Sequence, residues 1–236
     1  MLKIPTKQKE FVIDFPDTFK NIAIKMSGGT DSSIMAFMLA TYKTQYRPDI
    51  ELHAITMNHP LKPFQIPFSQ QVISWIEQQF GFKFASHTTG TGTASGNYAD
   101  EQGILVRKSY AKYNIDAHFM GQTANPIDYK ENQLLVDQWD WRCEERDIEM
   151  KDQLQGTDYV SSEYSEFTKE DIFYRGYYPF VYVDKRCIAE LYEYFNITDT
   201  LFPLTRSCEK ETTDFSHHCG RCWWCAEREY GFGRLV

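Results

Sequence analysis

The stretch KMSGGTDSSIMAF at residues 25–37 constrains the fold most, because it joins an apolar strand to a helix through two adjacent glycines. Residues 21–26 have the pattern of a short buried strand, and apolar residues recur at helical spacing over 32–43. Such a turn exposes consecutive backbone N–H groups, and the helix N-terminus adds partial positive charge. The pattern therefore predicts an anion site that needs no basic side chain.

Glycines and hydroxyl residues fill this turn, which is typical of a phosphate or pyrophosphate site. The glycines allow a phosphate to approach the backbone closely, and the hydroxyls add donors. The alternative is a plain Gly-Gly turn with a serine N-cap and no ligand. The whole SGGTDSS motif, placed between a strand and a helix, favours the phosphate site. The predicted phosphate-binding residues are Ser27, Gly28, Gly29, Thr30, Asp31, Ser32 and Ser33.

Strands and helices alternate along the first half of the chain. This order predicts an α/β fold in which helices flank a parallel sheet, with ligands bound where the strands end. Residues 90–99 are rich in glycine, serine and threonine and are expected to form a loop. The predicted strands are 21–26, 50–57 and 115–121, and the predicted helices are 32–43, 68–80 and 101–113.

The region 122–178 is polar and aromatic and has a less regular pattern. A structureless loop of this length is unusual in a compact domain, so we expect a helix within 132–153 and a lid over the site. Residues 177–183, YYPFVYV, have the composition of a strand. Asp184 is predicted to cap a helix over 185–195.

Four cysteines near the C-terminus have the spacing C-x10-C-x2-C-x2-C. Cys208, Cys219, Cys222 and Cys225 predict a tetrahedral Zn²⁺ site that stabilises a short segment with little core of its own. An iron–sulfur cluster is the rival, since four cysteines serve both centres. Cys143 and Cys187 stand apart from this group, and Cys187 is expected to lie in the core.

Composition limits the classes of partner. The 236 residues carry a net charge of −8, which argues against broad nucleic-acid binding. No apolar run reaches the roughly 18 residues of a membrane span, and the N-terminus has no signal-peptide core. We therefore expect a cytoplasmic protein whose cysteines are not structural disulfides.

The SGGTDSS motif resembles the SGGxDSS signature of the PP-loop ATP pyrophosphatases, which mostly cleave ATP between the α and β phosphates. The tail HCGRCWWCAERE, after an upstream SC, resembles the zinc motif of the 7-cyano-7-deazaguanine synthase family, with Arg228 matching its arginine. PFVYVDKRCIAEL resembles an element of that family whose lysine faces the nucleotide phosphates, which implies this role for Lys185. The implied domains are an ATP-binding domain at 1–200, with the lid-like region 122–178 inserted, and a four-cysteine zinc-binding segment at 201–236.

The resemblance implies an ATP-dependent ligase that adenylates a carboxylate, such as 7-carboxy-7-deazaguanine or a related deazapurine, and couples it to ammonia to form a nitrile. ATP, Mg²⁺ and Zn²⁺ are the implied cofactors, and a homodimer is a further expectation. The sequence departs from the family pattern at GILVRKSYAKY and MNHPLKPFQ, where the substrate would bind. The implied catalytic residues are Asp31 and Lys185, the implied nucleotide contacts beyond the turn are Thr56, Met57, Gly121 and Gln122, and the implied substrate contacts are Arg107 and Asp128.

Three other functions stay open from the sequence. In these alternatives the chain is another PP-loop enzyme that modifies tRNA or nucleotides or reduces an activated sulfate, a repurposed synthase that modifies a macromolecule, or a binding module without activity. A thiolating or reducing enzyme needs a catalytic cysteine outside the metal cluster, for which only Cys143 and Cys187 are present.

Overall fold

The computed structural model of the chain describes residues 1–60, 63–126, 128–138, 164–169, 172–210 and 215–236. The elements, in chain order, are β1 (Leu2–Pro5), β2 (Glu10–Ile13), β3 (Asn21–Lys25), α1 (Thr30–Gln45), β4 (Glu51–Asn58), α2 (Gln65–Phe80), β5 (Ser86–Thr91), α3 (Tyr98–Tyr113), β6 (Ala117–Met120), the 3-10 turn η1 (Tyr129–Glu131), α4 (Gln133–Gln138), β7 (Tyr164–Lys169), β8 (Ile172–Tyr177), α6 (Lys185–Tyr194), the 3-10 turn η2 (Phe202–Leu204) and α7 (Trp223–Phe232).

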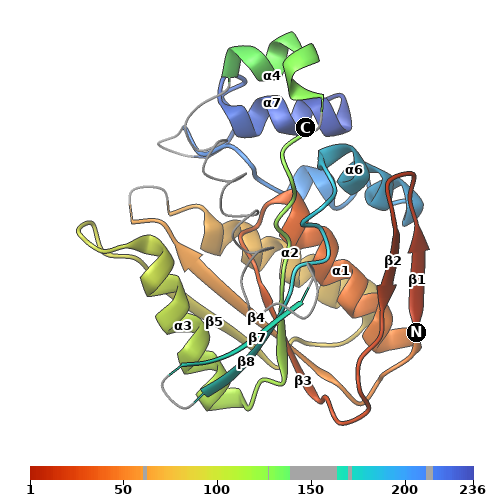
Figure 1. Cartoon of the computed structure of the whole chain (residues 1–236), viewed down its shortest axis with the longest axis vertical. Coiled ribbons are helices and arrows are strands. Elements are labelled where there is room, and N and C mark those ends of the chain that lie inside the picture. Colours follow the sequence, from red (N-terminus) through yellow and green to blue (C-terminus); the bar gives the residue numbers. More distant parts are fainter. Residues whose placement is uncertain (61–62, 127, 139–163, 170–171, 211–214) are drawn as a thin grey trace.

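A six-stranded sheet with the order β5–β4–β3–β6–β8–β7 forms the centre of the described structure (Figure 1). Five of these strands are parallel, and β7 pairs antiparallel with β8 at one edge. The strand before the glycine turn, β3, lies between β4 and β6. The predicted α/β fold with a parallel sheet and flanking helices is confirmed, and the turn lies at the carboxyl end of an interior strand.

Helices cover both faces of the sheet. One face packs its even-numbered β3 residues, Ile22 and Ile24, into a large core shared with α1, α2 and α6. The opposite face packs Ala23 against Val106 and Tyr110 of α3. Because side chains alternate along a strand, each residue at the end of β3 is directed to one of these two faces.

Local capping signals fixed several boundaries as predicted. Helix α2 ends at Gly81, whose φ of 70° is the left-handed conformation that glycine adopts readily. Asp184 caps α6 by accepting a hydrogen bond from the Arg186 backbone N–H at 2.9 Å. Cys187 of α6 is fully buried in the core, also as expected. The two caps depend on short-range chemistry, which a sequence carries directly.

The predicted strand at 177–183 is wrong beyond its first residue. The strand β8 ends at Tyr177, and the residues after it form turns, in which the N–H of Val181 donates to Tyr178 O at 3.2 Å. Pro179 lies in the middle of this run, where it would remove a ladder donor. The predicted loop at 90–99 is wrong at its start, because residues 90–91 belong to β5. This strand is polar, and its pairing with β4 rather than an apolar pattern makes it a strand.

The inserted region 122–178 contributes η1, α4 and two strands of the main sheet. The helix expected within 132–153 is present at Gln133–Gln138. Residues 139–153 of that predicted range, Cys143 included, lie outside the described residues, and the lid over the site stays a prediction.

A short antiparallel hairpin of β1 and β2 precedes the main sheet and was not predicted. Its buried residues Ile4, Phe11 and Ile13 join the same core as α1 and α6. The Phe11 ring meets the Phe180 ring edge-to-face at a centroid distance of 5.3 Å. The hairpin therefore extends the core rather than standing apart from it.

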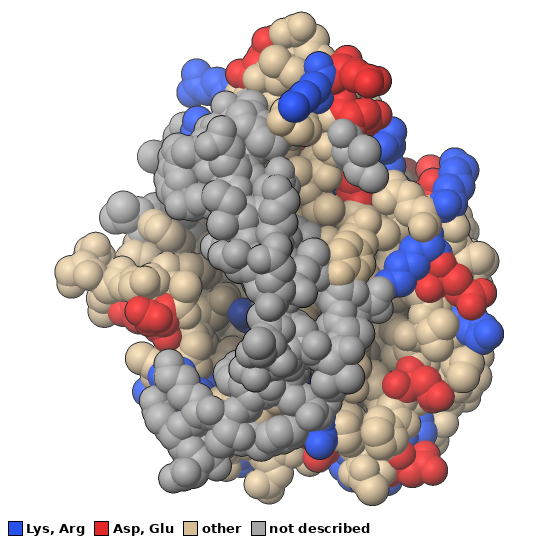
Figure 2. All heavy atoms as spheres, in the orientation of Figure 1, with Lys and Arg blue, Asp and Glu red and all other residues tan. Residues whose placement is uncertain are grey.

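Charged side chains of both signs are interspersed over the described surface seen in Figure 2. Among the described residues, none of the helices combines the length and the apolar character that crossing a bilayer requires.

Replacing Phe11 tests whether the hairpin belongs to the core. Phe11 is 2% exposed, so we expect Phe11→Ala to lower the free energy of unfolding by about 3–5 kcal/mol. The neighbouring Val12 is 51% exposed, and Val12→Ala is expected to change it by less than about 0.5 kcal/mol. Urea unfolding of both variants measures the difference, and equal losses would contradict this packing.

Candidate functional site

The glycine turn is held in one conformation by its contact with α2. Gly28 has a φ of 75°, and a Cβ placed on it would lie 2.5 Å from the Cβ of Phe68 and 2.9 Å from the backbone N of Ser69. Both the backbone conformation and the close approach therefore require glycine. Gly29 follows as the N-cap of α1 in an extended conformation, so the chain enters the helix directly from the turn.

Serine hydroxyl groups stabilise the turn through hydrogen bonds to one another and to its backbone. Ser27 Oγ lies 3.1 Å from Ser32 Oγ and accepts a hydrogen bond from the Gly29 N–H at 3.2 Å. Ser33 Oγ donates to Gly29 O at 2.7 Å. The first N–H groups of a helix have no carbonyl partner within that helix, so the start of α1 presents donors and partial positive charge at this point.

An ion pair joins the start of α1 to the start of α6. Lys185 Nζ lies 2.7 Å from both carboxylate oxygens of Asp31, and 3.5 Å from Glu227 Oε2 on α7. The side chains of Lys185 and Glu227 are 5% and 2% exposed, whereas that of Asp31 is 18% exposed. Thr30 Oγ1 donates to Asp31 Oδ1 at 3.0 Å. Two residues distant in the sequence, both implied to be catalytic by the resemblance, are thus in direct contact.

The end of β6 lies against this pair. A Cβ added to Gly121 would lie 2.6 Å from the backbone carbonyl carbon of Asp31, so only glycine allows the two segments to approach so closely. Thr123, just beyond it, donates its hydroxyl to Asp31 Oδ2 at 3.5 Å. The carboxyl ends of β3 and β6 therefore meet at the first turn of α1.

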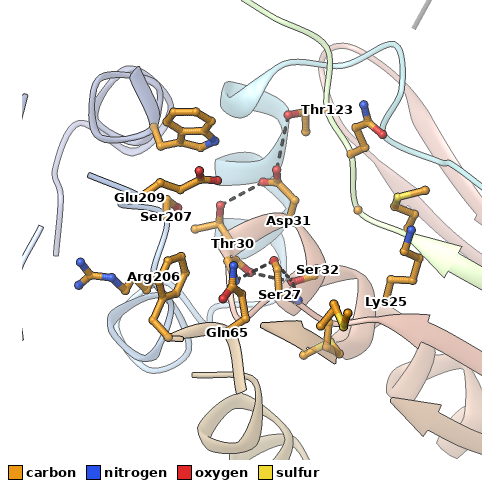
Figure 3. A pocket seen from close by; sticks show the side chains of 18 of the residues that line it. Lys25, Ser27, Thr30, Asp31, Ser32, Gln65, Thr123, Arg206, Ser207 and Glu209 are labelled. Atoms are coloured by element: carbon orange, nitrogen blue, oxygen red, sulfur yellow. Dashed lines mark hydrogen bonds between the residues drawn. The ribbon is translucent and has the colours of Figure 1, made fainter. Parts of the chain in front are cut away.

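A cavity of about 330 Å³ opens over the turn, in the size range of small-molecule sites. Figure 3 shows Asp31, Ser27 and Ser32 between side chains on either side of it. Predicted residues that line it are Ser27, Gly29, Thr30, Asp31, Ser32, Met57, Gly121, Gln122 and Lys185. Residues that the sequence reasoning did not select are Lys25, Met26, Ile55, Phe64, Gln65, Tyr98, Gln102, Met120, Thr123, Arg206, Ser207, Glu209, Trp224 and Glu227.

The remaining predicted residues lie outside the lining of this cavity. Gly28 lies against α2, and Ser33 donates its hydroxyl to Gly29 O, so both support the turn without lining the cavity. Thr56 is fully buried and bonds to His87 Nε2 at 2.8 Å and to Ser69 Oγ at 3.1 Å. Asp128 contacts Arg186 at 3.1 Å and accepts a hydrogen bond from Tyr230. Arg107 lies on α3, half-buried.

The four C-terminal cysteines form one cluster. All four Sγ atoms of Cys208, Cys219, Cys222 and Cys225 lie within 4.8 Å of one another. The Sγ atoms of Cys222 and Cys225 are 3.5 Å apart, and those of Cys219 and Cys225 are 3.9 Å apart. Four thiol groups converging on one point are a donor set for a metal ion.

Helix α7 connects this cluster to the cavity. It begins directly after Cys222, contains Cys225, and carries Trp224 and Glu227 into the cavity lining. Arg228, which is fully buried, anchors it: its guanidinium donates to Phe202 O at 3.0 Å, to Thr205 Oγ1 at 2.9 Å and to Leu235 O at 2.6 Å. Burial lowers the pKa of Arg228 to about 10, which leaves it charged at neutral pH.

Comparisons with known proteins assign no family. No family model matches the chain, and no curated protein matches it. Among solved structures, it is similar to the U34-tRNA thiolase NcsA from Methanococcus maripaludis, determined with its [4Fe-4S] cluster. The identity is 14%, the match covers 91% of this chain and 71% of that chain, and the TM-score is 0.45. A likeness at this level gives this chain neither a family nor an activity.

Alanine substitutions at two left-handed glycines separate backbone strain from the contact with α2. Gly81→Ala is expected to cost about 1–2 kcal/mol of unfolding free energy, because a Cβ there meets nothing within 4 Å and only the φ of 70° is strained. We expect Gly28→Ala to cost more, because its Cβ also collides with Phe68. Chemical unfolding of both variants checks this, and equal costs would contradict the close contact.

Proposed function

We propose that this chain is a PP-loop enzyme that binds ATP with its phosphates against the turn Ser27–Ser33. The observation that carries the proposal is the glycine-locked turn at the carboxyl end of an interior parallel strand, opening into a cavity at the start of α1. Open α/β sheets bind ligands at this place, and helix N-termini favour phosphate. The SGGTDSS motif, which resembles the PP-loop signature, occupies this position.

In the proposed reaction ATP activates a carboxylate. A carboxylate oxygen forms a bond to the α phosphorus, the bond from that phosphorus to the α–β bridging oxygen breaks, and pyrophosphate leaves with the electron pair. Ammonia then attacks the acyl carbon, and AMP leaves to give an amide. The amide oxygen then forms a bond to the α phosphorus of a second ATP, and a second pyrophosphate leaves. The bond between the carbon and that oxygen breaks, AMP leaves with the electron pair, and the nitrogen, having lost both of its protons, is left as the nitrile. A deazaguanine-type carboxylate is the proposed substrate, supported by the resemblance at both ends of the chain.

The chain's own contribution is to position groups and to stabilise charge. The amides at the start of α1 and the Lys185 ammonium are the proposed donors to phosphate oxygens. Asp31, with oxygens 2.7 Å from Lys185, is the proposed Mg²⁺ ligand, since this cation prefers oxygen ligands. When bound, Mg²⁺ supplies charge neutralisation of the phosphates.

For the cysteine cluster we propose zinc. Tetrahedral Zn²⁺ with Zn–S bonds of about 2.3 Å requires sulfurs about 3.8 Å apart. The Sγ separations of 3.5 Å for Cys222–Cys225 and 3.9 Å for Cys219–Cys225 are close to that value, and all four Sγ atoms lie within 4.8 Å of one another. A four-iron cube has to fit between its cysteine ligands and therefore holds their sulfurs further apart. The donor set and its spacing support a single tetrahedral ion.

Thiol chemistry has less support. Cys187 is fully buried at 3.2 Å from Thr6 Oγ1, and burial raises the pKa of its thiol to about 11. A reactive cysteine has a lowered pKa and access to its substrate. Cys143, the other cysteine outside the cluster, lies outside the described residues. The cytoplasmic location and the homodimer stay predictions.

Pyrophosphate release tests the proposed reaction. We expect the protein to release pyrophosphate from ATP when 7-carboxy-7-deazaguanine and ammonia are both supplied, and mass spectrometry to detect the nitrile product. Lys185→Met is expected to lower the turnover by at least about tenfold, because it removes a cation from the phosphate site. An assay of Lys108→Met, an exposed position on α3, is the matched control. A protein that does not bind ATP would contradict the proposed function.

Metal analysis tests the zinc site. We expect one zinc per chain and no visible iron–sulfur absorption in protein purified without oxygen. Cys222→Ala is expected to lose the zinc, whereas Cys187→Ala, at an equally buried position, keeps it. Iron and acid-labile sulfide in stoichiometric amounts would contradict the assignment.

A further inference from the structure

Lys25 is a charged residue at the end of the buried strand β3. Its side chain points to the face of the sheet opposite to the one on which the phosphate turn continues into α1. Ala23, two residues earlier, packs on the α3 face of the sheet, while Ile22 and Ile24 pack on the α1 face. Alternation along β3 therefore sends the Lys25 side chain to the α3 face. The turn Ser27–Ser33 leads instead into α1, on the other face.

No carboxylate of the described residues pairs with the ammonium of Lys25. Among the described residues it has neither a hydrogen-bond nor an ion-pair partner, although the side chain is partly buried and lines the cavity. Lys185 differs, because Asp31 and Glu227 balance its charge. Burying an unpaired ammonium is costly, and here desolvation lowers the pKa of Lys25 to about 8. The chain carries a net charge of −8, yet none of the acids that the structure describes pairs with this ammonium.

The neighbours of Lys25 do not supply the missing charge. Its register partners are Ile55 on β4 and Met120 on β6, both apolar. His118 on β6 is buried, bonds through Nδ1 to the Tyr110 hydroxyl at 2.8 Å, and is neutral because burial and Lys25 lower its pKa to about 3. Within the described part of the chain, nothing therefore balances the positive charge that this ammonium presents to the cavity.

Apolar and polar groups both line the cavity around Lys25. Ile55, Met57 and Met120 give apolar walls, and Tyr98, Gln102 and Gln122 add polar atoms at the edges. Tyr98 is fixed there by its hydroxyl, which donates to Met57 O at 2.6 Å. Figure 3 shows Lys25 across the pocket from Arg206 and Glu209, with Ser27 and Ser32 between them.

We propose that Lys25 binds the carboxylate of the substrate that is to be adenylated. This assignment rests on the proposed function and adds the residue that recognises the acyl substrate. The proposed donors to the phosphates, the amides of α1 and Lys185, belong to the other face, so Lys25 is left for a different anion. An ammonium between two anions also reduces their repulsion as the carboxylate oxygen approaches the α phosphorus.

Protection of the Lys25 amine from chemical modification tests the proposal in the unaltered protein. The protein is treated with limiting acetic anhydride near pH 8, and mass spectrometry measures acetylation of Lys25. The additions are α,β-methylene-ATP alone, this analogue with 7-carboxy-7-deazaguanine, and this analogue with the corresponding carboxamide. We expect protection with the carboxylate and little with the analogue alone or with the neutral carboxamide.

Two variants provide an independent measurement. Lys25→Met is expected to weaken binding of the carboxylate by at least about 30-fold while ATP affinity changes by less than about threefold, because only one charged contact is lost. We also expect it to raise Tm in the absence of ligands, since an unpaired buried charge is removed. Lys108→Met, exposed on the outer side of α3, is expected to change none of these.

Protection of Lys25 by the nucleotide analogue alone would assign it to a phosphate and overturn the proposal. Absence of carboxylate-dependent protection in protein that binds the analogue would overturn it as well, as would a Lys25→Met variant that binds the carboxylate like the parent. A parent protein that binds no ATP contradicts the proposed function itself, and this assignment with it.

Discussion

The ion pair between Asp31 and Lys185 holds together the parts of the chain from which the candidate site is built. Lys185 is the first residue of α6, where the helix dipole disfavours a cation. Asp31 in the first turn of α1 and Glu227 on α7 offset this cost, because both carboxylates lie within 3.5 Å of its ammonium. Breaking a buried pair of this kind typically costs about 3–5 kcal/mol. A lysine that is locally unfavourable is therefore explained by contacts that only the tertiary structure provides.

Packing around this pair leaves little freedom in the backbone. Gly121 at the end of β6 brings that strand against the backbone of Asp31, and Gly28 brings the turn against α2. A side chain at either position would push apart segments that now touch. The donors at the start of α1 are consequently fixed relative to two strand ends before any ligand arrives. Preorganised donors of this kind stabilise charge without the cost of rearrangement.

The sequence predicted those features that depend on neighbouring residues. Hydrophobic periodicity located β3, β4 and the helices α1 to α3, and capping residues located the end of α2 and the start of α6. Pairing partners distant in the sequence decided the rest. The polar strand β5 is a strand because β4 lies beside it, and the run containing Pro179 is apolar because it fills the core, as Phe180 does, without joining a ladder. Lys25 had one local signal, a charge at the end of an apolar strand. That no described carboxylate pairs with it could be seen only in the fold.

The two motifs that lie at opposite ends of the chain belong to one structural unit. Helix α7 carries Cys225, Trp224 and Glu227 within four consecutive residues, so one short helix contacts both the cysteine cluster and the cavity. Trp223 and Ala226 of this helix share a small buried apolar cluster with Leu135 of α4. Arg228 is held by uncharged groups, Phe202 O and Thr205 Oγ1, of the segment that precedes the cysteines. A metal that fixes the start of α7 would thereby also fix Glu227 beside Lys185. The cysteine cluster is then a structural support of the candidate site, even though its thiols lie outside the lining of the cavity.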